Sequence, residues 1–70
     1  MEEMEVCLAD NLRGIRLRAG ETQWELAEVC GVSPTAISNY EHGNRQPDLE
    51  TLVRIARHYH VTLDELVFKS

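Results

Sequence analysis

The residues best able to bind a metal or to carry redox chemistry are two cysteines and three histidines in a chain of 70 residues. Cys7 and Cys30 are far apart in the sequence, and His58 and His60 are two positions apart, which places them on different faces of a helix. Zinc sites need ligand pairs at short, regular spacing. We therefore expect no metal site, and we interpret Cys30 as a small buried hydrophobic residue in a reducing cytoplasm.

Catalytic chemistry is not indicated either. The sequence offers no nucleophile with a base, no pair of carboxylates and no glycine-rich phosphate loop, so we expect no enzyme, no cofactor and no small-molecule substrate. What remains is hydrogen bonding by the small polar side chains between Ser33 and Asn39. Their role depends on the elements that position them.

The segment of residues 22–41 has the pattern of two short helices joined by one sharp turn. Thr22 and Glu25 have the spacing of a capping box, in which hydroxyl and carboxylate each accept a backbone N–H. The first helix is therefore expected to begin near Gln23. Gly31 follows at the position where a left-handed residue can end a helix at little cost.

The second helix of this segment is expected to begin at Pro34, directly after Ser33. Ser33 can cap it, and Pro34 suits the first turn because its missing N–H would have no partner there. Ile37 and Tyr40 should face inward. Two helices joined through a glycine, with small polar side chains pointing outward from the second, are what a helix-turn-helix needs to enter a DNA groove.

The first helix of the chain is indicated by apolar residues at helical intervals, ending at Gly20. These residues are Met4, Leu8, Leu12, Ile15 and Ala19. The helix can begin as early as Glu3, which would place Glu2, Glu3 and Glu5 at its positive end. The alternative for this acidic run is a frayed, solvated terminus.

Two further helices are expected after a turn-rich loop at residues 42–47. Asp48 can cap the fourth helix, and His60 lies at its exit, where histidine tolerates a positive φ. Thr62 and Glu65 repeat the capping box and start a short fifth helix. The expected inner residues are Leu49, Leu52, Ile55, Ala56 and Tyr59, followed by Leu63, Leu66 and Val67.

These patterns predict one all-α domain over residues 1–70, with residues 1–7 as an acidic extension or the start of the first helix. No apolar run is long enough to span a bilayer. The acidic amino terminus differs from the basic start of a secretory signal. We therefore expect a cytoplasmic protein without membrane contact. A chain this short has a marginal core, which makes oligomerisation plausible.

The order and spacing of these pieces resemble the DNA-binding domain of Cro and C1-repressor-type helix-turn-helix regulators, from about Leu8 to Leu66. The resemblance rests on Arg16, on TQWELAEVCGVS and ISNYEHGNRQP, and on DLETLVRIARHYHVTLDEL. It implies a compact five-helix, lambda-repressor-like fold whose second and third helices form the helix-turn-helix. It also implies that Arg16 pairs with Glu41 to hold the fold, without contacting DNA.

The resemblance further implies which residues contact DNA. They are Gln23, Ser33, Pro34, Thr35, Ser38, Asn39, Asn44 and Arg45. Gln23 matches a backbone contact at the start of the second helix. Asn39 is the strongest base reader, because its amide can pair bidentately with adenine. The alternative for each residue is a solvated polar group, which we favour for Ser38 and Asn44 but not for Asn39.

Three features depart from the family pattern. The formal charge is −5, and leaving out Glu2, Glu3 and Glu5 changes it only to −2, whereas DNA-binding domains usually have a basic face. Trp24 occupies an outward position, where it can pack on DNA sugars or cover Ala27; we favour the second interpretation. Glu21 replaces a common apolar residue, and the sequence does not explain it.

The acidic charge predicts weak binding by a monomer, so we expect a homodimer on a palindromic operator. Phe68 falls outside the inner stripe of the last helix, and Val53 lies near the edge of its own stripe; together they are our expected dimer interface. The alternative is that Phe68 folds back over the first helix, against Met4 or Leu8, in a monomer.

Two functional classes remain. The favoured one is a sequence-specific transcriptional regulator, repressor-like, that inserts its third helix into the major groove of double-stranded DNA as a dimer. The alternative is a helix-turn-helix protein-binding module, such as an antitoxin or adaptor, which the acidic charge favours.

Overall fold

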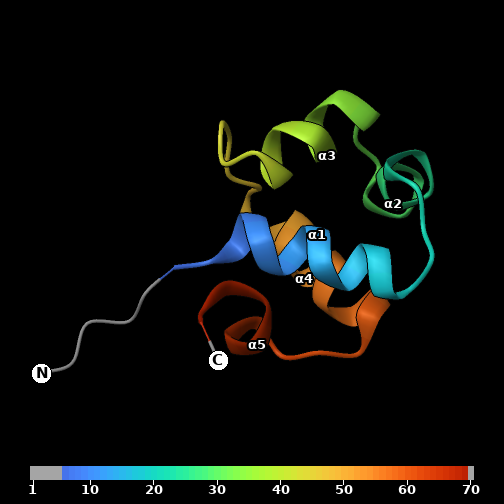
Figure 1. Ribbon diagram of the computed structural model, residues 1–70. Coiled ribbons are helices and arrows are strands. Elements are labelled where there is room, and N and C mark those ends of the chain that lie inside the picture. Colours follow the sequence, from blue (N-terminus) through green and yellow to red (C-terminus); the bar gives the residue numbers. More distant parts are fainter. Residues whose placement is uncertain (1–5, 70) are drawn as a thin grey trace, which may run out of the picture.

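Five helices make up the described part of the chain, residues 6–69 of the computed structural model (Figure 1). They are α1 (Leu8–Arg18), α2 (Gln23–Cys30), α3 (Pro34–Glu41), α4 (Leu49–Tyr59) and α5 (Leu63–Val67). Within these residues the extended pairing is limited to one isolated bridge, so the expected all-α class is confirmed. The helix α3 lies across one end of the molecule, and α5 lies at the opposite end (Figure 1).

The helix starts follow from local capping. The hydroxyls of Thr22 and Thr62 accept the backbone N–H three residues on, and the carboxylates of Glu25 and Glu65 accept the N–H of the cap. Asp48 caps α4 by accepting the N–H of Thr51 at 2.9 Å. Each of these helices begins where its cap predicts, because capping needs contacts within one turn only.

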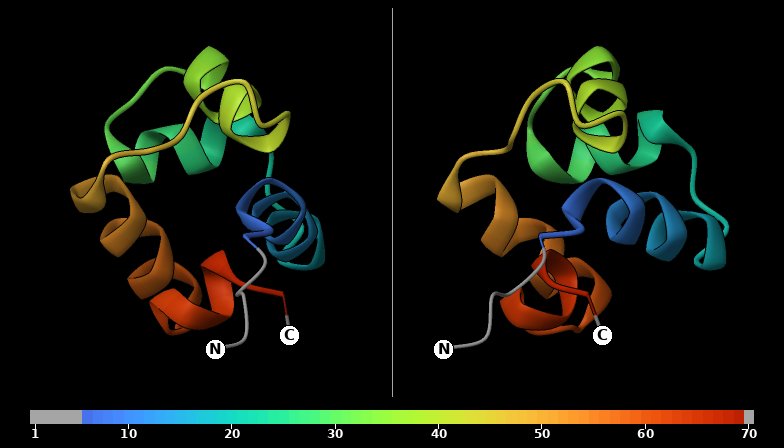
Figure 2. Two further views of the ribbon diagram at one scale, coloured as in Figure 1. Left: turned by 90° about the vertical axis from the view of Figure 1, so that its left-hand side faces the viewer. Right: turned by 60° about the vertical axis from the view of Figure 1, so that its left-hand side comes forward.

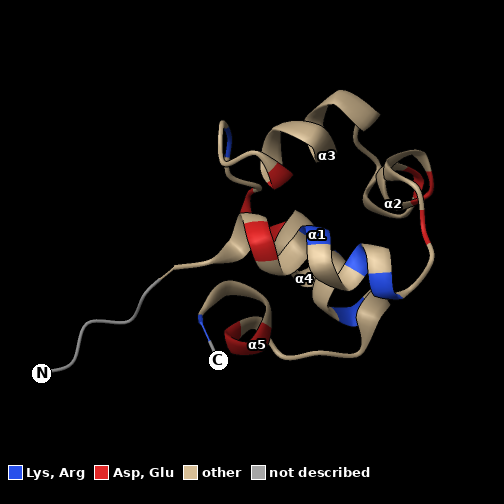
Figure 3. Cartoon of the chain, viewed as in Figure 1, with Lys and Arg blue, Asp and Glu red and all other residues tan. Residues whose placement is uncertain are grey.

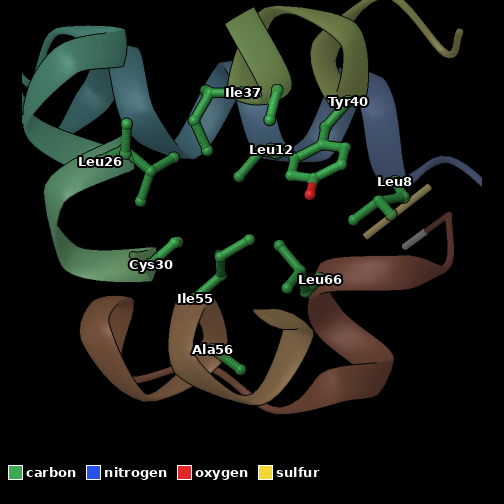
Figure 4. Close-up of a cluster of buried hydrophobic side chains, with 11 residues drawn as sticks. Leu8, Leu12, Leu26, Cys30, Ile37, Tyr40, Ile55, Ala56 and Leu66 are labelled. Atoms are coloured by element: carbon green, nitrogen blue, oxygen red, sulfur yellow. The ribbon is translucent and has the colours of Figure 1, made fainter. Parts of the chain in front are cut away.

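The core lies between all five helices (Figure 4). Its fully buried large side chains are Leu12, Leu26, Ile37, Ile55 and Leu66, one from each helix. Cys30 and Tyr40 are buried among them, as expected. The core therefore anchors the inner sides of α2 and α3 to the other three helices.

The first helix begins at Leu8 and not at Glu3. Val6 pairs with Phe68 in an antiparallel bridge, and the Cys7 N–H donates to the Val67 carbonyl at 2.8 Å. This pairing holds the segment before α1 in an extended form. Figure 2 shows the segment after α5 running beside it. The expectations for Met4, Glu2 and Glu5 concern residues outside those that the structure describes.

Three residues of the expected inner stripes point outward. Ala19 is exposed at the end of α1, Leu49 is 68% exposed, and Leu63 is 37% exposed. Leu49 and Leu63 are each the first residue of their helix. A helix end can project beyond its neighbours even when its periodicity continues the buried stripe, so periodicity alone placed these residues wrongly.

Candidate nucleic-acid interface

The turn between α2 and α3 fixes the direction of α3. Gly31 ends α2 with a φ of 70°, a left-handed conformation, and the Val32 N–H then donates to the Ala27 carbonyl at 3.1 Å. The Ser33 hydroxyl accepts the Ala36 N–H at 3.1 Å, and Pro34 occupies the first turn. These local bonds set the start of α3 with little freedom.

The inner side of α3 is held by Ala36, Ile37 and Tyr40, all buried. The positions predicted to face a groove lie on the other side. Thr35 is exposed, and Pro34, Ser38 and Asn39 are half-buried. Figure 3 shows α3 free of lysine and arginine, with Glu41 as its one charged residue. The outward side of α3 is therefore an uncharged surface of hydroxyl and amide groups.

The end of α3 is fixed to α1 by a buried ion pair between Arg16 and Glu41. Arg16 Nε donates to Oε2 at 2.6 Å and Nη2 donates to Oε1 at 2.9 Å, while Nη1 reaches the Glu21 carbonyl at 2.7 Å. The hydrogen bond to Glu41 is the largest influence raising the pKa of Arg16. Burial would raise the pKa of Glu41, but hydrogen bonds from Arg16 and Gln23 lower it. Both groups are therefore charged, and they orient each other.

Gln23, the predicted phosphate contact, lies beside this pair. Its Nε2 donates to Glu41 Oε1 at 3.2 Å, so the amide is positioned at the first turn of α2 near the end of α3.

The loop after α3 presents Asn44 and Arg45, whose side chains are exposed. Their backbone N–H groups both donate to the Asn39 carbonyl, at 3.0 and 3.4 Å. The loop is thus tied to α3 through Asn39, and the two predicted loop contacts keep a fixed relation to the predicted base reader.

His42 was not singled out by the sequence, which placed it in the loop. It is exposed, and its Nδ1 lies 2.7 Å from the Ser38 carbonyl and 3.4 Å from the Ser38 hydroxyl. The signal available in the sequence was its spacing of four from Ser38, which puts the two on one side of a helix.

Glu21, which the sequence did not explain, joins the end of α1 to the end of α4. Its carboxylate accepts a hydrogen bond from the Tyr59 hydroxyl at 2.6 Å and lies 2.7 Å from His58 Nε2. Burial would raise the pKa of Glu21, but these two hydrogen bonds and the nearby charges of His58 and Arg16 lower it. A carboxylate replaces the usual apolar residue because α4 supplies two polar partners for it.

Trp24 and Ala27 line one groove on α2, so the expected packing of Trp24 over Ala27 and its neighbours stays a prediction. Trp24 is 74% exposed, whereas Ala27 is buried. The side chain stands at the second position of α2 and lines a shallow groove with Glu28, Val32 and Pro34.

The predicted dimer residues are not fully exposed. Val53 and Phe68 are both half-buried. Besides the bridge to Val6, the Phe68 carbonyl accepts a hydrogen bond from Asn11 Nδ2 at 3.0 Å, which holds the end of the chain against α1. These contacts fix the Phe68 backbone while leaving part of the residue accessible.

Among residues 6–69, no cluster of three or more potential metal ligands occurs. Cys7 and Cys30 are free thiols, and burial raises the pKa of Cys30, which disfavours the reactive thiolate. In the same part of the chain, every helix is too short or too polar to cross a membrane.

Comparison with known proteins agrees with this geometry. The family model described as Helix-turn-helix matches residues 12–66. The HTH-type transcriptional regulator ImmR of Bacillus subtilis (strain 168) is 39% identical over 63 residues, covering 90% of this chain and 50% of that protein. The chain therefore spans only half of that relative's length.

Two solved structures are also similar. A transcriptional regulator from Listeria innocua aligns with a TM-score of 0.87 and 32% identity, covering 90% of this chain and 59% of the other. The P22 c2 repressor, in complex with synthetic operator 9T, aligns with a TM-score of 0.80 and 27% identity, covering 84% and 89%. The fold, the ion pair of α1 with α3 and these matches agree, and the chain belongs to the helix-turn-helix family of the Cro/C1-repressor type.

Proposed function

We propose that this protein is a sequence-specific DNA-binding regulator of transcription, repressor-like, that inserts α3 into the major groove. The observation that carries the proposal is the outward side of α3. Its inner side packs into the core, mainly against α1 and α2, and its outer side offers Thr35, Ser38 and Asn39 without competing charge. Hydroxyl and amide groups on a rigid helix can read base edges.

The roles of the other residues follow from their places around α3. Gln23 and the start of α2 bind a backbone phosphate, and Asn44 and Arg45 bind phosphates beyond the end of α3. Ser33 and Pro34 lie at the first turn, where Pro34 offers apolar contact to a thymine methyl. Arg16 and Glu41 hold α3 in position. The P22 c2 repressor, which binds its operator with a similar fold, supports this arrangement.

The acidic charge requires a second source of affinity. With a formal charge of −5, the chain gains little from counterion release, so a single domain binds weakly. A homodimer through Val53 and Phe68 would present two copies of α3 to a palindromic operator. The protein would act in the reducing cytoplasm, in keeping with its two free thiols.

Selection of bound sites from random duplex DNA tests this function. The expected result is a palindromic sequence with half-sites about one helical turn apart. Enrichment of single half-sites would contradict the proposed dimer but would still support sequence-specific DNA binding. Absence of any enriched sequence, with a folded protein at low salt, would contradict the proposal.

A protein-binding module, such as an antitoxin or an adaptor, is the second candidate. The acidic charge favours it, and so does the exposed Trp24 beside the groove lined by Glu28 and Pro34. The two candidates differ in whether the protein selects a DNA sequence, and Trp24→Ala tests whether that selection needs the indole. If the protein is a regulator, the variant still selects the wild-type DNA sequence. If it is a protein-binding module, the wild type selects no DNA sequence at all.

A further inference from the structure

His42 is fixed at the end of α3 with one ring nitrogen engaged and the other available. A carbonyl oxygen only accepts hydrogen bonds, so the 2.7 Å contact with the Ser38 carbonyl requires a proton on Nδ1. Nε2 has no hydrogen-bond partner among residues 6–69, and the residue is exposed. In the neutral ring Nε2 is an acceptor, and in the protonated ring it becomes a second donor.

The position of His42 continues the outward side of α3 toward the loop. Pro34, Ser38 and His42 are spaced by four residues, so they form one stripe along the helix. Asn44 and Arg45 follow, tied to the same helix end. A helix in the major groove contacts bases through its first turns, so its far end meets the backbone at the groove edge.

The charges around this helix end are mixed: Asp10 lines a groove with Gly43 and Arg45, and Arg45 is close enough to Asp48 to help lower its pKa. Arg13 and Arg16 of α1 lie near Glu41, whose pKa their charges help to lower, and Arg16 neutralises that carboxylate. The loop adds the exposed Arg45. From α2 the neutral amide of Gln23 reaches this end of α3.

The acidic groups of α2 are placed differently. Glu25 and Glu28 line the groove beside Pro34, at the opposite end of α3. The end that carries His42 therefore has arginine side chains beside its carboxylates, whereas the groove lined by Glu25 and Glu28 has none in its lining.

We infer that His42 is a DNA-backbone contact of this domain, binding a phosphate through Nε2–H in its protonated form. This inference rests on the proposed function. It adds a positive charge that the formal charge of −5 does not count, since that value takes histidine as neutral. A phosphate within hydrogen-bond distance favours the protonated imidazole, so binding takes up a proton and affinity rises as the pH falls.

The test measures binding of a duplex selected with the wild type, and of a mixed-sequence duplex of equal length, by fluorescence anisotropy. Measurements are made at about pH 6 and about pH 8, across a salt series. The wild type should bind about tenfold more tightly at the lower pH, as expected for a charged hydrogen bond. The gain should appear with both duplexes, because a phosphate contact carries no sequence information.

Three variants separate this role from a merely structural one. His42→Gln should lose the pH dependence and, at about pH 6, reduce the salt slope by about one. His42→Arg, which is charged at both pH values, should bind tightly at both. His60→Asn, at the exposed exit of α4 where asparagine tolerates the φ of 57°, should keep the wild-type pH dependence.

The outcomes are separable. If His42→Gln keeps the wild-type pH dependence and salt slope, the inference is overturned and the proposed function stands. If the pH dependence disappears in His42→Gln but the salt slope does not change, the phosphate assignment is overturned. If the wild type binds neither duplex, both proposals fail. Because His42→Arg tests a gain at high pH, a loss of stability in His42→Gln cannot imitate the expected result.

Discussion

At the scale of single residues, the recognition that we propose for α3 depends on few side chains. Asn39 is half-buried, and its carbonyl is occupied by the N–H groups of Asn44 and Arg45. Its backbone is therefore held while its amide side chain remains the one group on α3 that can form two hydrogen bonds to one base.

We expect Asn39→Ala to cost about 1 to 3 kcal/mol of binding free energy and to relax the preference at one base pair. Competition binding between the selected sequence and single-base variants measures both effects. Leu17→Ala, at an exposed position of α1 outside the proposed DNA contacts, is the control and should keep the base preference. An equal loss on every sequence would show that Asn39 does not read a base.

The ion pair of Arg16 with Glu41 is the second prediction at this scale. Both side chains are buried, so removing either one leaves an uncompensated charge. Arg16→Met or Glu41→Gln should each destabilise the fold by about 3 to 5 kcal/mol, and the double variant by less than the sum. Denaturant unfolding of all four proteins gives the coupling energy. Additive losses would mean that the pair contributes no coupling.

At the scale of elements, the connection from α1 to α2 is held by three side chains, one from α1 and two from α4. Arg16 reaches the Glu21 carbonyl, and the Glu21 carboxylate is held by Tyr59 and His58 of α4. This network sets where α2 begins, and α2 in turn sets the turn into α3. The placement of α3 therefore depends on Arg16, which binds both the Glu21 carbonyl before α2 and Glu41 at the end of α3.

This network makes the stability of the fold depend on pH. Glu21 and Glu41 have a pKa lowered from the ordinary value of 4.5. A lowered folded-state pKa contributes stability above the unfolded value, and that contribution is lost as the pH falls through the folded pKa. The free energy of unfolding should therefore decrease as the pH is lowered below about 4.5.

Urea unfolding at a series of pH values measures this dependence. Glu21→Gln removes one of the two carboxylates, so its unfolding free energy should be lower at neutral pH and should decline less in acid. An acid decline as steep as that of the wild type would show that the Glu21 contacts do not stabilise the fold.

A helix cap provides another prediction at this scale. Thr22 accepts the Glu25 N–H at 3.1 Å, and Thr22→Ala removes this acceptor at the start of α2. The expected loss is about 1 kcal/mol of stability. Thr22→Ser, which keeps the hydroxyl, should retain most of it. Thermal unfolding compares the three proteins, and equal midpoints would exclude a contribution from the cap.

At the scale of the whole molecule, the end of the chain is the region that an assembly would use. Phe68 and Val53 are half-buried, which leaves part of each for a second copy. A two-fold pair would place two copies of α3 about 34 Å apart, one turn of DNA. Such a pair would offset the low affinity of an acidic monomer.

We expect the wild type to sediment as a dimer at micromolar concentration and Phe68→Asp to sediment as a monomer with weaker DNA binding. Leu17→Asp is the matched control, because Leu17 is 56% exposed on α1. It should leave the dimer intact. Unfolding measurements on both variants show whether they are folded. A wild type that stays monomeric with and without DNA would rule out this interface.

The helix starts at Gln23, Pro34, Leu49 and Leu63, and the positive φ of His60, were predictable from neighbouring residues alone. Capping groups and left-handed exits act within about one helical turn, so the information lies in adjacent residues. The outward side of α3 was also predictable from nearby residues. Its apolar residues recur at helical spacing on one side, which leaves the polar residues on the other.

The contacts between distant segments could not be predicted from the sequence and are seen only in the tertiary structure. The bridge of Val6 with Phe68 moved the start of α1 to Leu8, and α4 supplied the partners of Glu21. The apolar periodicity of α4 also predicted an inner position for Leu49, but this residue lies at a helix end that projects past its neighbours and is exposed. These cases have one cause. Burial and pairing depend on which segments pack against each other, and that packing is determined jointly by residues far apart in the sequence.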